Sequence, residues 1–67
     1  MEIILNNRTE TIAGDAMTIN ELINYKNFTF KMLVTKINGK LVKVDKRDDA
    51  VVRTGDNVEI LHLISGG

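Results

Sequence analysis

Cysteine, proline and tryptophan are all absent from the 67 residues of this chain. Without cysteine the chain has no disulfide, no thiolate nucleophile and no sulfur ligand for zinc. A single domain of this length must then be stabilised by its own core or by a partner. Chains of about 60 residues bury only about 60% of the surface that they expose when unfolded, which argues against a large internal active site.

An excess of charge of either sign is also absent, because nine basic residues balance nine acidic ones. Domains that bind nucleic acid carry a positive excess that neutralises phosphates. The longest apolar stretches, such as Ile3-Ile4-Leu5, fall far short of the roughly 18 residues that cross a bilayer. The first residues also lack the basic and apolar segments of a secretion signal. We therefore expect a cytoplasmic protein that binds neither nucleic acid nor membranes.

Asparagine-containing turns predict two β-hairpins, because asparagine tolerates the positive φ that tight hairpin turns require. The first hairpin joins residues 1–5 and 8–12 through Asn6-Asn7, and the second joins residues 32–37 and 40–44 through Asn38-Gly39. In the second, Leu33, Thr35 and Ile37 are expected to share one face. After a turn at Gly55-Asp56, residues 57–65 form the last and longest predicted strand.

One short helix is predicted between the hairpins. Thr18 and Glu21 have the spacing of a capping box, in which each side chain accepts a hydrogen bond from a backbone N–H at the helix start. Ile19, Leu22 and Ile23 then follow at helical spacing on one face. The helix is expected to end near residues 25–27.

These elements predict an α+β fold in which one helix packs across a mixed sheet of four to five strands. The first and last strands are the most apolar, so they are expected to form a central pair. They would run parallel, because the long connection between them allows a crossover. Val51 and Val52 are expected to pack against the core. Residues 1–67 are interpreted as one domain with a flexible tail over residues 65–67.

Alternation along the last strand assigns its side chains to two faces: Val58, Ile60, His62 and Ile64 to one, and Glu59, Leu61, Leu63 and Ser65 to the other. Because Glu59 points to water, Leu61 and Leu63 are expected to do so too, as a candidate docking patch. Two alternatives remain open. The charged loop covers these leucines, or exposed leucines have no meaning by themselves.

Evidence for catalysis or metal binding is weak. His62 has no nucleophile arrangement around it and is interpreted as a partly buried packing residue. Asp45, Asp48 and Asp49 match no calcium-loop spacing, so a solvated loop is expected and no metal site is predicted. No phosphate-binding glycine loop is present, so ATP, if involved, would bind to another protein.

The sequence ends in Gly66-Gly67. A tail without Cβ atoms can enter a narrow channel, as a carboxylate that serves as a substrate must. A frayed tail without function explains the same residues, and the tail alone favours this second explanation.

Several segments together resemble a known family. They are residues 1–6, the capped helix with Leu22-Ile23, the run 37–42 around Asn38-Gly39, the run 55–60, and the Gly-Gly end. Over essentially the whole chain they resemble the ThiS family, the ubiquitin-like β-grasp sulfur carriers of thiamine biosynthesis. Residues 43–48 depart from the family pattern, because many members have a proline and an aromatic residue there.

The resemblance implies a substrate protein and not an enzyme. An E1-like adenylyltransferase of the ThiF type uses ATP to adenylate the carboxylate of Gly67, and the carrier itself binds no cofactor. A persulfide supplied by a cysteine desulfurase gives a thiocarboxylate, which donates sulfur to a thiazole synthase of the ThiG type. On this account Gly66 is expected to be the adaptor of the tail, and Leu61 and Leu63, with Ile4, are expected to dock the partner.

Two further functions stay open beside this one. The chain is a carrier for another recipient, such as the small subunit of molybdopterin synthase, or it is a ubiquitin-like interaction module. Fold alone does not separate these possibilities.

Overall fold

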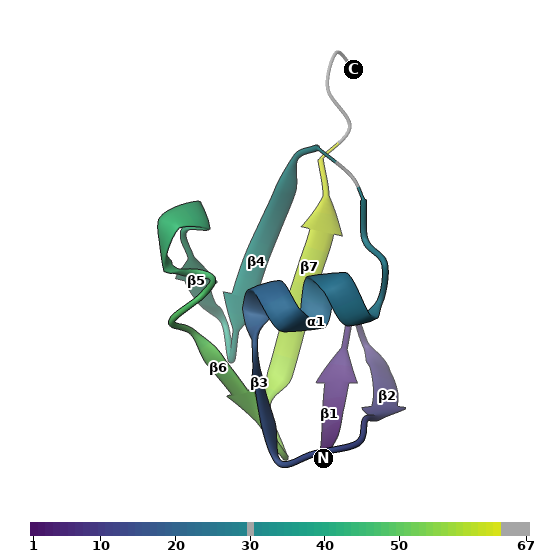
Figure 1. Ribbon diagram of the computed structural model, residues 1–67. Helices are drawn as coiled ribbons and strands as arrows, with labels where there is room; N and C mark the ends of the chain where they lie inside the picture. Colours follow the sequence, from purple (N-terminus) through teal and green to yellow (C-terminus); the bar gives the residue numbers. More distant parts are fainter. Residues whose placement is uncertain (30, 64–67) are drawn as a thin grey trace.

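The computed structural model describes residues 1–29 and 31–63. One helix crosses a five-stranded sheet, and a two-stranded sheet lies beside it (Figure 1). In chain order the elements are β1 Glu2–Leu5, β2 Arg8–Thr11, β3 Ala16–Thr18, α1 Ile19–Tyr25, β4 Leu33–Ile37, β5 Lys40–Val42, the 3₁₀ helix η1 Val44–Lys46, β6 Val51–Arg53 and β7 Asn57–His62.

Both predicted hairpins form. Asn6 and Asn7 take φ values of 51° and 68° between β1 and β2, and Asn38 and Gly39 take 51° and 82° between β4 and β5. Two successive residues with positive φ match the right-handed twist of the flanking strands. Each hairpin therefore pairs in register, as in Ile4 opposite Thr9 and Lys36 opposite Leu41.

The main sheet has the strand order β2-β1-β7-β4-β5. As predicted, β1 and β7 run parallel near its centre, and β7 pairs on its other side with β4 in antiparallel orientation. This mixed sheet with one crossing helix is the predicted β-grasp arrangement. The beginning of the last strand thus lies between two neighbouring strands in the interior of the sheet.

Helix α1 begins with the predicted capping box. The Thr18 hydroxyl accepts a hydrogen bond from the Glu21 N–H at 3.1 Å, and a Glu21 carboxylate oxygen accepts one from the Thr18 N–H at 2.9 Å. Ile19 and Leu22 are fully buried against the sheet. The helix has seven residues and is about 10 Å long, so it covers only part of that face.

A second, two-stranded sheet was not predicted. β3 pairs with β6, which places Met17 opposite the fully buried Val52. Val52 packs into the core as expected, whereas Val51 is exposed. The predicted strand over residues 40–44 is too long, because Val44 already begins η1.

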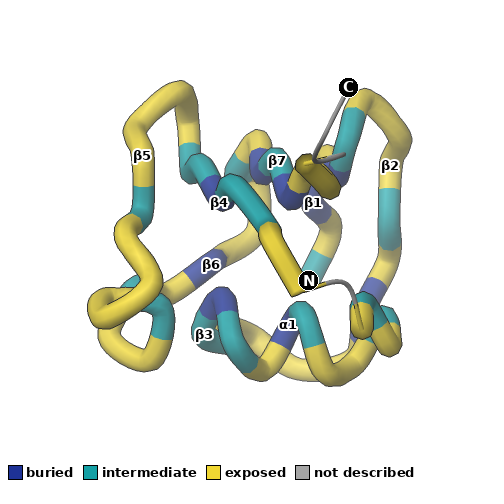
Figure 2. The backbone as a smooth tube through the Cα atoms, turned by 90° about the horizontal axis from the view of Figure 1, so that it is seen from above, coloured by how far each residue is buried: buried dark blue, intermediate teal, exposed yellow. Residues whose placement is uncertain are grey.

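The core lies between α1 and the inner face of the sheet. Figure 2 shows that α1 lies on one side of β4, β7 and β1, and within the described residues no element covers the other side. Among the described residues, one polar side chain is fully buried: the Thr35 hydroxyl donates to the Val42 carbonyl at 2.7 Å and accepts from Arg47 Nε at 3.2 Å. The buried apolar residues are Ile3, Leu5, Ile12, Ile19, Leu22, Val52, Val58 and Ile60.

Candidate functional site

Two of the three predicted site residues that the structure describes, Leu61 and Leu63, lie at the carboxyl end of β7 and directly after it. The predicted alternation of buried and exposed side chains holds here: Val58 and Ile60 are buried, whereas Leu61 is 43% and Leu63 46% exposed. The strand itself ends at His62, although the Leu63 N–H still donates to the Met32 carbonyl at 3.0 Å. Neither leucine is covered by the charged loop, so they present apolar surface to solvent.

Cross-strand pairing extends this apolar surface over the outer face, the side of the sheet away from α1. Leu61 lies directly opposite the half-buried Val34 of β4. The next pair toward the middle of the sheet consists of Lys36 and Glu59, which have opposite charges. We call Val34, Leu61 and Leu63 the outer patch. It is an apolar surface bordered by one charge of each sign.

Ile4 lies on the same outer face but apart from the outer patch. It is 43% exposed and stands opposite Asn57 at the beginning of β7. Leu61 is four residues further along that strand, or about 13 Å at roughly 3.3 Å per residue. The structure thus pairs Leu61 with Val34, which the sequence did not indicate, and leaves Ile4 at a distance.

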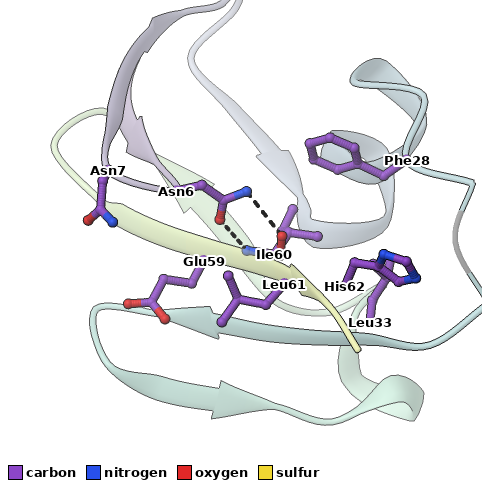
Figure 3. Close-up of a pocket in the computed structure, with 8 residues that line it drawn as sticks. All are labelled: Asn6, Asn7, Phe28, Leu33, Glu59, Ile60, Leu61 and His62. Carbon is purple, nitrogen blue, oxygen red and sulfur yellow. Dashed lines mark hydrogen bonds between the residues drawn. The ribbon is translucent and has the colours of Figure 1, made fainter. Parts of the chain in front are cut away.

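A hollow of about 490 Å³ follows the β1 side of β7 (Figure 3). β1 ends at Leu5, opposite Val58, so within the part of the chain that the structure describes the second half of β7 has no neighbouring strand on this side. Phe28, in the connection between α1 and β4, forms the far wall of the hollow. The lining residues are Asn6, Asn7, Phe28, Leu33, Glu59, Ile60, Leu61 and His62.

The contact between Asn6 and Ile60 in this hollow was not predicted from the sequence. Asn6 Nδ2 donates to the Ile60 carbonyl at 3.0 Å, and Asn6 Oδ1 accepts from the Ile60 N–H at 2.8 Å (Figure 3). Asn6 was predicted only as a turn residue. No local signal reveals this contact, because the two residues are 54 positions apart.

The expected burial of His62 is wrong. His62 points to the inner side of the sheet, opposite Leu33, as alternation predicts, but it is exposed. The reason is that β7 extends past the seven-residue helix, so no helix covers this end of the inner face (Figure 1).

The remaining predicted site residues, Gly66 and Gly67, and the tail of residues 65–67 lie outside the described residues. In the described ranges, no group of three or more His, Asp and Glu side chains is placed to hold a metal ion. The same ranges contain no helix long and apolar enough to cross a membrane.

Solved structures of other proteins share this architecture. The crystal structure of the thiamine biosynthesis protein ThiS from Geobacter metallireducens matches with a TM-score of 0.89 and 23% identity, over 100% of both chains. A solution structure of a thiamine biosynthesis protein from the same organism matches with a TM-score of 0.81 and 25% identity, over 100% of this chain and 88% of the other. No curated relative matches significantly. The sequence model of the ThiS family matches residues 3–67, and the chain therefore belongs to the ThiS family.

Proposed function

We propose that this chain is a sulfur carrier of thiamine biosynthesis whose reacting group is the carboxylate of Gly67. The observation that carries the proposal is the family match, which runs through the predicted core and on to residue 67. Membership of the ThiS family and the two thiamine biosynthesis neighbours support a carrier role in this pathway.

The chemistry needs an activated carboxylate. An oxygen of the Gly67 carboxylate attacks the α-phosphorus of ATP and releases pyrophosphate, which leaves an acyl adenylate. The terminal sulfur of a persulfide then attacks the acyl carbon and displaces AMP. A thiol cleaves the resulting S–S bond, which yields the thiocarboxylate and a disulfide.

Other proteins supply the catalytic groups in this scheme. A ThiF-type adenylyltransferase binds ATP, a cysteine desulfurase supplies the persulfide, and a ThiG-type thiazole synthase receives the sulfur. The carrier binds no cofactor and catalyses no step. We place the reaction in the cytoplasm, because persulfides and thiols persist in a reducing compartment.

The carrier's own residues present the tail. Gly66 and Gly67 have no Cβ, so the last two residues fit a narrow channel. Leu61 and Leu63 of the outer patch dock the enzyme close to the start of this tail, and Ile4 extends the contact along the outer face. The absence of cysteine removes an internal thiol that could attack the activated ester.

The test is the intact mass of the chain after incubation with ATP, a ThiF-type enzyme and a persulfide donor. We expect a mass gain that corresponds to replacement of one carboxylate oxygen by sulfur. A variant that lacks Gly67 should keep its amide NMR spectrum and gain no sulfur. An unchanged mass of the intact chain, or an equal gain in the variant, would contradict the proposal.

The recipient is then identified with the sulfur-loaded chain. We expect sulfur transfer to a ThiG-type thiazole synthase. Transfer only to the large subunit of a molybdopterin synthase would assign the carrier to that pathway instead. An amide bond between Gly67 and a lysine of another protein would indicate a protein modifier.

A further inference from the structure

The second half of β7 is held on its β4 side by a strand and on its β1 side by one side chain. Toward β4, Leu61 pairs with Val34, and the Leu63 N–H donates to the Met32 carbonyl. Toward β1, strand pairing stops at Val58, whose carbonyl accepts from the Asn6 N–H at 2.9 Å. The Asn6 carboxamide then binds the next backbone groups on this side.

This carboxamide replaces one residue of a strand. A residue in a sheet offers its neighbour one N–H and one C=O, and Asn6 offers Nδ2–H and Oδ1 to the C=O and N–H of Ile60 at 3.0 and 2.8 Å. Aspartate in this place would accept from the N–H but would repel the carbonyl, because an ionised carboxylate has no donor. The amide is thus suited to both backbone groups.

The turn does not explain this contact. Asn7 has the larger positive φ of the two turn residues, and it is exposed, with its side chain away from Ile60 (Figure 3). Asn6 is half-buried at the edge of the hollow beside β7. Because the hollow is open, no neighbouring strand supports this side of β7 if the amide is lost. The amide already pairs with the backbone N–H and C=O of Ile60, so these two groups are not available to an additional strand in the hollow.

We propose that Asn6 is a positioning residue that fixes the direction in which the chain leaves the sheet toward Gly67. This inference rests on the proposed function. Without the carboxamide, the end of β7 is paired with β4 alone, and two-stranded ribbons twist more strongly than strands inside a sheet. The carboxylate would then reach the adenylylation site in the correct orientation less often, while the outer patch still docks.

The test compares Asn6→Gly with the matched control Asn7→Gly. Both changes put glycine at a positive φ in the same turn, so they relieve the same kind of backbone strain. Only Asn6→Gly removes the contact with Ile60. Adenylation kinetics with a ThiF-type enzyme are measured as ATP-dependent pyrophosphate release, at a temperature where unfolding curves show every variant to be folded.

We expect Asn6→Gly to lower kcat about tenfold and to leave KM within about twofold, because misplaced reacting groups slow the reaction without weakening docking. Asn7→Gly should match the original chain. The kcat of Asn6→Asp, which keeps only the acceptor, should lie between the kcat of Asn6→Gly and that of the original chain. In amide relaxation measurements, Leu61 and Leu63 should become more mobile in Asn6→Gly than in Asn7→Gly.

Three outcomes overturn the inference. An unchanged kcat in Asn6→Gly, with only the stability lowered, would make Asn6 a structural residue and leave the carrier function intact. Equal effects of Asn6→Gly and Asn7→Gly would assign the change to the turn backbone. If the original chain is not adenylated at all, the proposed function fails first, and the inference fails with it.

Discussion

At the scale of residues, asparagine and glycine occupy the positions of the described backbone that need a positive φ. All four non-glycine residues with positive φ in residues 1–29 and 31–63 are asparagines, namely Asn6, Asn7, Asn27 and Asn38. The short amide side chain tolerates this region better than other residues except glycine. Asn38 also links two turns, because its amide donates to Asp56 at 3.0 Å and accepts from the Asn57 N–H at 2.9 Å. Individual polar residues therefore set the ends of the strands.

The cap of α1 gives a prediction at this scale. Thr18→Ala should lower the free energy of unfolding by about 1 kcal/mol, because the Glu21 N–H loses its acceptor at the helix start. Urea unfolding followed by circular dichroism measures this change. Thr29→Ala, at an exposed threonine in the connection after α1, is the control and should change the free energy by less than about 0.5 kcal/mol. Equal losses in both variants would show that the cap contributes nothing.

At the scale of elements, the helix depends on the sheet for its stability. A helix of seven residues is too short to form by itself in water, so the burial of Ile19 and Leu22 must stabilise it. The same holds for β3 and β6, which have three residues each and pair around the buried Val52. These short elements exist because they pack on the main sheet.

Leu22→Ala tests this dependence. It should cost about 2–5 kcal/mol, because a fully buried leucine leaves a cavity between α1 and the sheet. Domains of this length rarely have more than about 3–5 kcal/mol of stability, so the variant is expected to be largely unfolded. Thermal unfolding by circular dichroism provides the measurement. Tyr25→Ala on the same helix, at a residue that is 58% exposed, should keep the fold, because little packing is lost and alanine favours the helix. Equal destabilisation of the two variants would show that the burial of Leu22 is not what stabilises the helix.

At the scale of the whole molecule, the two faces of the sheet differ in how they are covered. The inner face and α1 form the core, whereas the outer face has no covering element in the described residues and carries the outer patch. A change on the outer face should therefore affect binding to a partner far more than folding. In the proposed function, this separation lets one small sheet serve both as a stable domain and as a docking surface.

Leu61→Ser combined with Leu63→Ser tests the docking role. We expect KM for the carrier in adenylation to rise about tenfold, because serine removes buried apolar contact at the interface. The melting temperature should stay close to that of the original chain, since both leucines are already more than 40% exposed. Val44→Ser, at a residue that is 71% exposed on η1, serves as the control and should leave KM unchanged. A KM unaffected by the double change would remove these leucines from the interface.

Local patterns alone determined much of this structure. The two asparagine turns, the Thr18 cap and the exposure of Leu61 and Leu63 were predicted, because each depends on turn chemistry, helix capping or side-chain alternation. The parallel β1–β7 pair was predicted from the apolar character of the two strands and the long connection between them. The docking role of these leucines and the reactivity of Gly67 remain predictions. Only the tertiary structure decided the β3–β6 pair, the exposure of His62 and the contact of Asn6 with Ile60. Three-residue strands are too short for a periodic pattern, and the other two features depend on where segments far apart in the sequence end beside one another in space.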